Sequence, residues 1–360
     1  HEYRRLMKQK MVMERQLSRR GWGPVVRAKA LEPGQRGGEV VALRNRLIAM
    51  GYMAPTPRAE YGQELQAGVR AFQDAHGLEV DGVTGPTTIQ QVNVSLEKRL
   101  QSVVVAMERE RWLNRDRGTR HVLVNLTDFH AQIIDDGRVT FRTRSVIGKN
   151  QSDRRSPEFS DVMEHMVINP SWYVPRSIIT KEYLPKLQRN PNAVSYLEIT
   201  DSRGRVVNRG AVNFSQYSAR TFPFAMRQPP GQRNALGLVK FMFPNKHNIY
   251  LHDTPEKALF GRESRAYSHG CIRLADPFDF AYALLAAQTD RPKDEFHRIL
   301  SSGRETKVEL EAPVPVHLIY RTAFTDDKGK IHYRRDVYER DAKIWQALSQ
   351  EGVAISAVRG

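Results

Sequence analysis

The sequence predicts a multidomain α+β protein, in which a small three-helix module precedes a β-rich domain that carries a long insertion. Three observations lead to this prediction. The 360 residues are enough for two or three domains with sizeable cores. Up to residue 113, apolar side chains recur at the spacing of helices. From residue 119 the spacing changes to that of short strands separated by turn residues.

Helices flank the predicted module on both sides. Residues 1–31 form an N-terminal helical segment, because residues 2–20 are rich in good helix formers before Gly21 interrupts the pattern. Residues 95–117 form a connecting helix, since apolar side chains gather on one side of residues 95–113.

The module itself covers residues 32–94. A second helix runs from about Gln63 to His76, with apolar side chains at helical spacing and Gly77 placed as its C-cap. A third helix follows the turn residues 78–88. The first helix carries an apolar stripe formed by Val40, Val41, Leu43, Leu47 and Ile48.

The β-rich domain covers residues 118–310. Runs at 121–126, 131–134 and 139–143 have the composition of short strands. Asp135-Asp136-Gly137 is a hairpin turn between the second run and the third. The sequence therefore predicts an antiparallel start to the sheet.

A long insertion at residues 150–233 leaves the strand pattern. It is rich in Pro, Asn and Arg, with a helical stretch at about 177–188. A segment of this length inside a compact domain is usually functional or a subdomain. Trp172 within it either stacks on a substrate or anchors the subdomain by packing.

The C-terminal part returns to regular elements. Residues 277–288 are expected to form a helix that packs on the sheet. A C-terminal extension covers residues 311–360. Strands at 307–324 are broken by Pro313 and Pro315, which suits an edge strand or a bend, because proline lacks the N–H that a ladder needs. Two further elements are expected, a short strand at 331–333 and a helix at 341–350.

Composition narrows the possible partners. Apolar residues make up 40% and charged residues 27%, and no run approaches the ~18 apolar residues of a membrane span. The net charge is +16, and residues 1–30 hold nine Lys or Arg against two acidic residues. A basic surface suits nucleic acid, anionic lipid or an acidic polymer. No nucleic-acid module is recognisable, so we expect no nucleic-acid partner.

The N-terminus shows no targeting segment. The first residues are polar and basic, without the apolar core of a signal peptide. The chain begins with His rather than Met, so we expect its natural N-terminus to lie further upstream.

The single cysteine, Cys271, is the strongest functional signal. It lies in Ser268-His269-Gly270-Cys271-Ile272-Arg273, and His252 precedes it by 19 positions. A lone cysteine cannot form an internal disulfide, and its polar neighbours are unusual for an apolar core position. These observations favour a nucleophile over an inert thiol.

The residues around this pair carry a family resemblance. Phe243-Pro244-Asn245 leads into the His252 run, and Arg265-Ala266-Tyr267 leads into the cysteine run. The ordered block resembles the active site of YkuD-type L,D-transpeptidases, which cross-link bacterial peptidoglycan. The resemblance implies a mixed-sheet catalytic domain in which residues 150–233 form a capping subdomain over the cleft, as in larger Gram-negative members.

The same resemblance implies an activity, an inhibitor class and a location. The reaction would form 3-3 cross-links between a tetrapeptide stem donor and an amine acceptor, through a cysteine acyl-enzyme. Carbapenems would act as covalent inhibitors. The location would be the periplasm of a Gram-negative bacterium.

The module at residues 32–94 carries a second resemblance. It is similar to the small helical peptidoglycan-binding module found beside many cell-wall enzymes. The matching features are Gly51-Tyr52, Phe72-Gln73, Asp81-Gly82, Gly85 and Thr88.

The implied chemistry assigns roles to the residues around the thiol. A free cysteine is only a few per cent ionised at pH 7, so a base must take the proton of Cys271, and the resemblance gives this role to His252. Asp253 or a backbone carbonyl would hold the histidine tautomer. Backbone N–H groups around Gly270 and Cys271 would stabilise the oxyanion, and Tyr250 would add a hydroxyl.

Other residues of the block are candidates for supporting roles. His269 is expected to orient its neighbours rather than to act as the base. Arg273 either binds a substrate carboxylate or forms a structural ion pair. Ser268 and Asn245 are candidates for substrate binding, and Asn245 is equally a candidate for capping a turn. No cofactor and no metal are expected. Four histidines are expected to be surface or packing residues: His121, His130, His165 and His247.

Several alternative functions stay open. A carboxypeptidase or cysteine peptidase would hydrolyse the same donor, and a related transpeptidase would attach proteins to peptidoglycan. A zinc site would need Cys271, His252 and His269 as ligands. A non-catalytic scaffold would use only the module. The sequence does not identify the acceptor, which could be a stem peptide, a free D-amino acid or a protein N-terminus.

Overall fold

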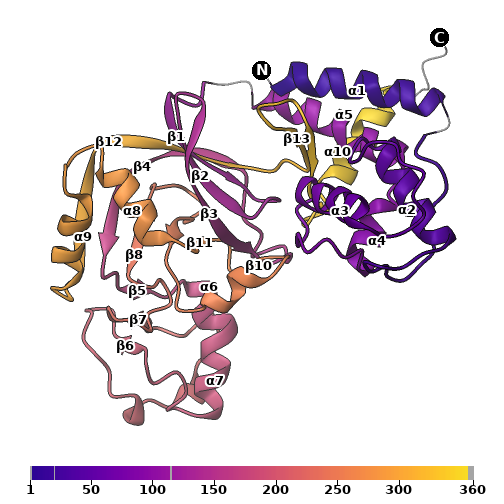
Figure 1. Cartoon of the computed structure of the whole chain (residues 1–360). Coiled ribbons are helices and arrows are strands. Elements are labelled where there is room, and N and C mark those ends of the chain that lie inside the picture. Colours follow the sequence, from indigo (N-terminus) through magenta and orange to yellow (C-terminus); the bar gives the residue numbers. More distant parts are fainter. Residues whose placement is uncertain (1, 20, 114–115, 356–360) are drawn as a thin grey trace. The chain divides into compact units, whose positions relative to one another are not determined.

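A computed structural model describes residues 2–19, 21–113 and 116–355. Residues 20, 114–115 and 356–360, which belong to the predicted N-terminal helix, connecting helix and C-terminal extension, lie outside this description. The chain divides into two compact units (Figure 1). Unit 1 comprises residues 1–116, 125–128 and 319–360, and unit 2 comprises residues 117–124 and 129–318. No helix among the described residues is both long enough and apolar enough to cross a bilayer.

Three helices of unit 1 lie where the sequence predicts them, at 2–20, 63–76 and 95–113. Each observed helix begins and ends within two residues of its predicted range. Ser95 starts the last of these helices, because its Oγ accepts a hydrogen bond from the N–H of Lys98 (3.2 Å). The helices are α1 (Glu2–Ser18), α2 (Gly38–Ala49), α3 (Gln63–Ala75), α4 (Pro86–Val92) and α5 (Leu96–Trp112).

Helices α2 to α4 form the predicted three-helix module around one apolar core that includes Leu43, Val69 and Phe72. Gln73 explains the Phe-Gln and Asp-Gly motifs of the sequence. Its amide donates to Asp81 Oδ1 (2.8 Å) and accepts from the Gly82 N–H (2.9 Å), so the second helix holds the turn before the third.

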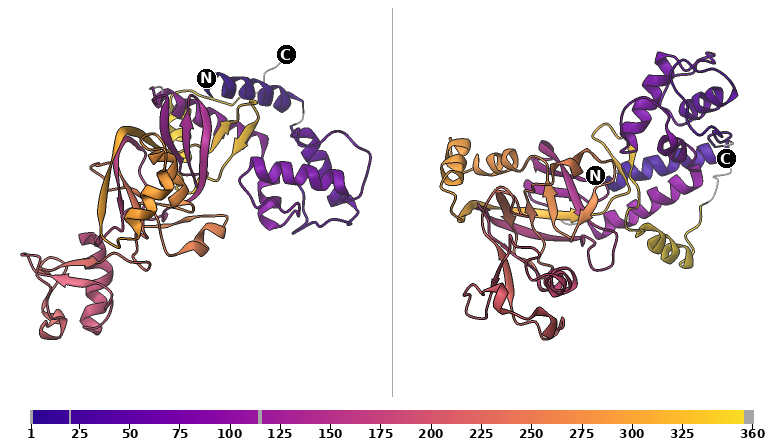
Figure 2. Two further views of the ribbon diagram at one scale, coloured as in Figure 1. Left: turned by 60° about the vertical axis from the view of Figure 1, so that its left-hand side comes forward. Right: turned by 90° about the horizontal axis from the view of Figure 1, so that it is seen from below.

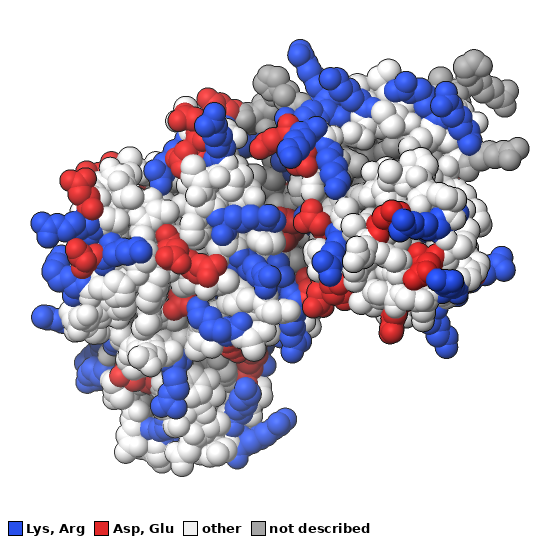
Figure 3. All heavy atoms as spheres, in the orientation of Figure 1, with Lys and Arg blue, Asp and Glu red and all other residues white. Residues whose placement is uncertain are grey.

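Basic side chains lie along helix α1. Figure 3 shows them along this helix at the top of the view. They are Arg4, Arg5, Lys8, Lys10 and Arg15.

The C-terminal segment belongs to unit 1. Strands β13 (Ala323–Thr325) and β14 (Ile331–Tyr333) form an antiparallel hairpin, and α10 spans Asp341–Gln350. Ala323 and Tyr333 share an apolar core with α1 and α5. The expected strand at 331–333 and helix at 341–350 are therefore confirmed.

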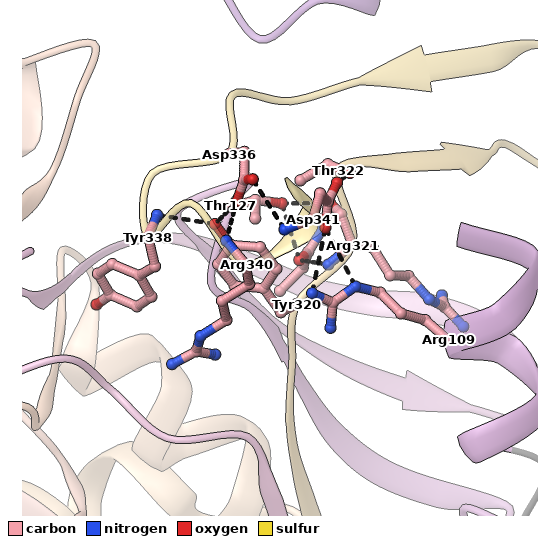
Figure 4. Close-up of polar contacts among 10 residues, drawn as sticks. Arg109, Thr127, Tyr320, Arg321, Thr322, Asp336, Tyr338, Arg340 and Asp341 are labelled. Carbon is pink, nitrogen blue, oxygen red and sulfur yellow. Dashed lines mark hydrogen bonds and ion pairs between the residues drawn. The ribbon is translucent and has the colours of Figure 1, made fainter. Parts of the chain in front are cut away.

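The carboxylates of Asp336 and Asp341 hold the C-terminal segment in place (Figure 4). Arg109 on α5 forms a buried ion pair with Asp341 (3.2 Å), and Thr322 donates a second bond to the same carboxylate. Asp336 accepts the Tyr320 hydroxyl and the backbone N–H of Arg340 (2.9 Å). Burial, followed by the charge of Asp336, raises the pKa of Asp341.

Unit 2 is built on a nine-stranded mixed sheet with the order β10-β3-β11-β9-β8-β4-β12-β1-β2. β2 also pairs with β3, so the sheet closes on itself. Pairs β10–β3 and β11–β9 are parallel, whereas β2–β3, β4–β8, β8–β9 and β4–β12 are antiparallel. The strands are β1 (Arg120–Asn125), β2 (His130–Asp135), β3 (Arg138–Gly148), β4 (Phe159–Ile168), β8 (Val239–Met242), β9 (Leu251–His252), β10 (Ala266–Ser268), β11 (Ile272–Leu274) and β12 (Thr306–Ile319).

The expectation of an edge strand around Pro313 and Pro315 is wrong. Both prolines lie in β12, which sits between β4 and β1 inside the sheet. The pairing with β4 shifts register between Glu309 and Val314. This irregularity bends the strand and accommodates the missing proline N–H groups, so the alternative of a bend is the one observed.

Helices α8 (Pro277–Leu285) and α9 (Pro292–Leu300) complete this part of unit 2. Phe280 on α8 packs against Phe241 of the sheet, with ring centroids 4.8 Å apart. The predicted packing of this helix is confirmed.

The insertion also departs from expectation. Residues 159–168, expected to leave the strand pattern, form β4 in the centre of the main sheet. The separate lobe comprises residues 172–236, hereafter the cap, which has its own apolar core and is drawn in pink in Figure 2. Its elements are β5 (Trp172–Tyr173), α6 (Arg176–Ile178), a π-helix (Ile179–Tyr183), α7 (Leu184–Arg189), β6 (Glu198–Thr200) and β7 (Ala225–Gln228), with 3₁₀ turns at Arg209–Ala211 and Phe214–Gln216.

Candidate active site

A cavity of about 1060 Å³ opens in unit 2 between sheet residues and cap residues. Cys271, His252 and Arg273 line it from the sheet, and Trp172 and Glu182 line it from the cap. The structure thus brings the predicted nucleophile and base to one cavity.

Cys271 is half-buried and immediately precedes β11. Its Sγ lies 3.8 Å from the carbonyl oxygen of Asn248, and Tyr250 favours a thiolate there through its backbone N–H and its hydroxyl. Burial raises the pKa of the Cys271 thiol to about 11, although Tyr250, Arg273 and Lys240 act in the opposite direction. The Cys271 side chain therefore rests as a thiol at neutral pH.

His252 ends β9 and is buried. Its Nδ1 donates to the backbone carbonyl of Asp253, which leaves Nε2 as the proton acceptor. Burial, followed by the charge of Arg273, lowers the pKa of His252 to about 3. Among the described residues His252 forms no hydrogen bond with Cys271 Sγ, and such contacts often close only around a substrate.

The carboxylate of Asp253 does not contact the imidazole. It accepts the backbone N–H groups of Leu238 (2.9 Å) and Thr254 (2.7 Å) and the ammonium of Lys257 (2.6 Å). Gly237 has φ +62°, and a Cβ there would lie 2.3 Å from this carboxylate, so the approach requires glycine. Of the two alternatives left open by the sequence, the backbone carbonyl orients His252.

The loop before Cys271 is held by serine hydroxyls. Ser268 Oγ donates to the Cys271 carbonyl (2.6 Å) and accepts the Gly270 N–H (3.1 Å), and Ser156 donates to the Gly270 carbonyl (2.6 Å). The Gly270 N–H is thus occupied, contrary to its predicted role as an oxyanion donor. The Cys271 N–H donates to none of the described residues, and Tyr250 offers a second donor beside Sγ.

His269 contacts the cap instead of the thiol. Its Nε2 lies 2.7 Å from Glu182 Oε1, and Arg154 binds the same oxygen at 2.7 Å. Burial alone would raise the pKa of Glu182, but the hydrogen bond and charge of His269, with Arg154, lower it. Glu182 lies on the π-helix, 87 positions from His269, and no sequence signal connected them. This contact favours the orienting role predicted for His269.

Arg273 is engaged by Glu256, so the structure shows the ion pair that the sequence left as one alternative. The other acid–base pairs at the cavity are Lys181 with Asp153 (2.6 Å) and Arg154 with Glu182. Arg233, a cap residue that sequence reasoning missed, lines the cavity, is exposed and forms no ion pair with any described residue. It is the basic side chain best placed to meet a substrate carboxylate.

The remaining candidates fall into two groups. Trp172 packs edge-on against Tyr183 in the cap core (6.4 Å), which is the anchoring alternative, and it also lines the cavity, so stacking on a substrate stays a prediction. Asn245 takes the second of its two alternatives, the capping of a turn, and it is not among the residues that line the cavity. Its amide bonds the carbonyls of Phe243 (2.6 Å) and Ile249 (2.8 Å) and caps the turn.

The structure also locates one of the histidines that were expected to have no special role. His247, expected to be an ordinary surface residue, is exposed and lines the cavity. Within the described part of the chain, no three His, Cys, Asp or Glu side chains are grouped so that they could hold a metal ion.

Comparisons with known proteins identify both domains of the chain. A sequence profile of the L,D-transpeptidase catalytic domain, YkuD, matches residues 119–308, and a profile described as a "Putative peptidoglycan binding domain" matches residues 36–92. The chain is 33% identical over 227 residues to a "Putative L,D-transpeptidase" of Haemophilus influenzae, covering 62% of this chain and 45% of that protein.

Two other similarities are partial. The chain is 42% identical over 60 residues to the N-acetylmuramoyl-L-alanine amidase CwlL of Bacillus licheniformis, covering 16% of this chain and 17% of that protein. It spans less than half the length of either curated relative. A crystal structure of an L,D-transpeptidase from Stackebrandtia nassauensis aligns with 82% of this chain and 97% of its own, at 13% identity and a TM-score of 0.31, which is too low to compare the folds further.

Proposed function

Because the chain belongs to the YkuD family of L,D-transpeptidases and carries an N-terminal peptidoglycan-binding domain, we propose that it forms 3-3 cross-links between peptidoglycan stem peptides through an acyl-enzyme on Cys271. The observation that carries the proposal is the placement of the single thiol. Cys271 lies in a cavity with the Tyr250 hydroxyl on its Sγ, an unengaged N–H of its own and a neutral His252 lining the same cavity.

Acylation follows from these groups. Sγ attacks the carbonyl carbon at the L-centre of the tetrapeptide donor while His252 Nε2 takes the thiol proton. The Cys271 N–H and the Tyr250 hydroxyl stabilise the oxyanion. Burial raises the pKa of Tyr250 well above its usual range, so this hydroxyl keeps its proton and can donate it. When the oxyanion collapses, the C–N bond breaks and His252 returns the proton to the departing D-amino acid.

Deacylation reverses the proton flow. An acceptor amine attacks the thioester carbonyl and His252 takes a proton from the amine. The C–S bond then breaks, and His252 passes this proton to the sulfur of Cys271, which regenerates the thiol. Water in place of the amine would give a carboxypeptidase product, and a protein amine would give protein attachment to peptidoglycan.

Product analysis tests the proposal and separates these outcomes. The purified chain is incubated with a tetrapeptide stem donor, with and without an acceptor stem, and the products are identified by mass spectrometry. A 3-3 linked dimer that requires the acceptor supports cross-linking. Tripeptide alone under both conditions would establish hydrolysis instead.

A carbapenem provides an independent test of the nucleophile. Its strained carbonyl offers the thiol the same tetrahedral path as the donor, so we expect a covalent adduct on Cys271. Intact-protein mass followed by peptide mapping measures it, with Cys271→Ala as the control. A mass shift that maps to another residue would contradict the mechanism.

Because peptidoglycan lies outside the cytoplasmic membrane, the proposed location is the periplasm of a Gram-negative bacterium. The module at residues 36–92 would hold the enzyme on the wall. The exposed basic side chains of α1 suit an acidic polymer as well. Release by osmotic shock, compared with a cytoplasmic marker, tests the location.

A further inference from the structure

Lys240 and Arg273 flank the proposed base on neighbouring strands. Lys240 on β8 lies directly opposite His252 in the antiparallel β8–β9 pair. Arg273 on β11 lies opposite His252 on its other side in the parallel β11–β9 pair. Residues opposite each other on adjacent strands place their side chains on the same face of a sheet. The base therefore stands between two cations.

These two cations differ in their partners. Arg273 is neutralised by Glu256. Lys240 is half-buried, and its ammonium forms no ion pair or hydrogen bond with any residue that the structure describes. Its Nζ lies 5.9 Å from the ring centroid of Tyr250, whose hydroxyl favours a thiolate at Cys271. A partly buried cation without a carboxylate partner is costly unless another negative charge compensates it.

The charged and titratable groups around Lys240 are few. Glu305, the residue before β12, attracts Lys240 electrostatically without forming an ion pair with it. One carboxylate oxygen of Glu305 accepts the N–H of Ser171 (3.1 Å). His165 on β4 feels its charge, and the direct β4 neighbour of Lys240, Val167, is apolar. Besides His252, Arg273 and Tyr250, the remaining group is Cys271.

We propose that Lys240 is a positioning residue that acts through Cys271, because its unpaired ammonium stabilises the thiolate that must form when the nucleophile attacks. The inference rests on the proposed function only in taking Cys271 as the nucleophile. Burial lowers the pKa of Lys240, and the charges of Glu305 and of a Cys271 thiolate oppose this effect. Lys240 in turn lowers the pKa of the thiol against the larger effect of burial.

Burial keeps both side chains uncharged at rest, and the two cations add to this effect at His252 but oppose it at Cys271. A cation on each side disfavours an imidazolium at His252, while both cations favour a thiolate at Cys271. Lys240 thus stabilises the negative charge of the Cys271 thiolate, and it does not favour protonation of His252 before the reaction. Its contribution appears when the proton leaves sulfur.

Alkylation of the thiol tests this inference directly. Cys271 is the only cysteine of the chain, so the iodoacetamide reaction of the full chain reports on a single site. Its rate is measured at neutral pH, where Lys240 carries its charge, for the wild type, Lys240→Met and Lys240→Arg. The control is Lys293→Met, which removes an exposed lysine of α9 that lies 5.5 Å from the ring centroid of Tyr282, away from the cavity.

At neutral pH the alkylation rate follows the thiolate fraction, so we expect the rate to fall about tenfold in Lys240→Met and much less in Lys240→Arg, which keeps the charge. Lys293→Met should match the wild type. A folded Lys240→Met with an unchanged rate would overturn the inference, as would equal losses of rate in the Met and Arg variants, which would indicate packing rather than charge. Because alkylation needs no donor, a lower rate in Lys240→Met beside a wild type without any cross-linking activity would leave this inference standing and reject the proposed function.

Discussion

His252 Nδ1 donates to the backbone carbonyl of Asp253, whereas the carboxylate of Asp253 binds two backbone N–H groups and Lys257. An orienting carboxylate can be removed by substitution, but a backbone carbonyl cannot. The tautomer of His252, the proposed base, is therefore set by the main chain at the end of β9.

This relationship makes Asp253→Asn informative. We expect kcat/KM within about tenfold of the wild type, in contrast to the ~10⁴ loss that follows when an orienting carboxylate is neutralised. The melting temperature should fall, because an amide offers one acceptor oxygen to three donors. Steady-state kinetics and thermal melting measure the two effects. A ~10⁴ loss in a folded variant would show that the carboxylate acts on His252.

Substitutions at the proposed nucleophile and base should differ in severity. Cys271→Ala and Cys271→Ser should abolish activity with the fold intact, because a serine hydroxyl is far harder to ionise. His252→Gln should cost roughly 10²–10⁴ in rate, as expected for a lost general base. His269→Gln should cost less, since it loses only the contact with Glu182. An inactive His269 variant beside an active His252 variant would reverse the assignment of the base.

Arg233 should recognise a carboxylate of the donor. Loss of a charge-assisted hydrogen bond costs about 1.5–3 kcal/mol, so Arg233→Gln should raise KM about tenfold or more for a donor with free carboxylates. A series of donors, each amidated at a different carboxylate, identifies the group that Arg233 binds. When the amidated carboxylate is the one that Arg233 binds, the wild type and Arg233→Gln should have equal KM for that donor. Arg220→Gln, an exposed cap arginine away from the cavity, is the control. An equal loss for every donor would contradict carboxylate recognition.

Deletion of residues 34–92 should separate wall binding from chemistry. The catalytic cavity lies wholly in unit 2, so cleavage of a small soluble donor should persist, while co-sedimentation with sacculi should fall. Unit 1 should lose stability, because Tyr333 stacks on His76 (5.3 Å) and Arg334 bonds the Ala75 carbonyl (3.1 Å). Unchanged sedimentation of the truncated chain would refute the binding role.

Burial of His252 should make the stability of unit 2 depend on pH. Its pKa is lowered from 6.5 to about 3, so between these values the unfolded state takes up a proton that the native state refuses. The free energy of unfolding should therefore fall as pH drops through this window, by up to about 1.4 kcal/mol per pH unit. Denaturant titrations of the wild type and His252→Gln measure the difference. Parallel curves for the two proteins would mean that the imidazole is accessible to protons when folded.

The sequence by itself determined the elements and the motif residues that depend on local order. Apolar spacing placed α3 and α5 within a residue or so, and the hairpin turn at Asp135–Gly137 separated β2 from β3. The ordered block around His252 and Cys271 predicted two residues that line one cavity. These features follow from periodicity and from short spacings that local chain geometry preserves.

Only the tertiary structure decided which distant groups meet. It paired His269 with Glu182, placed Lys240 opposite His252, and occupied the Gly270 N–H with Ser268. It also put the proline-containing β12 inside the sheet. Each of these depends on strand register or on hydrogen bonds between residues far apart in the chain, and a change of one residue in register would turn the side chain to the other face. The local sequence of a strand therefore does not determine which residues of the neighbouring strand lie opposite it.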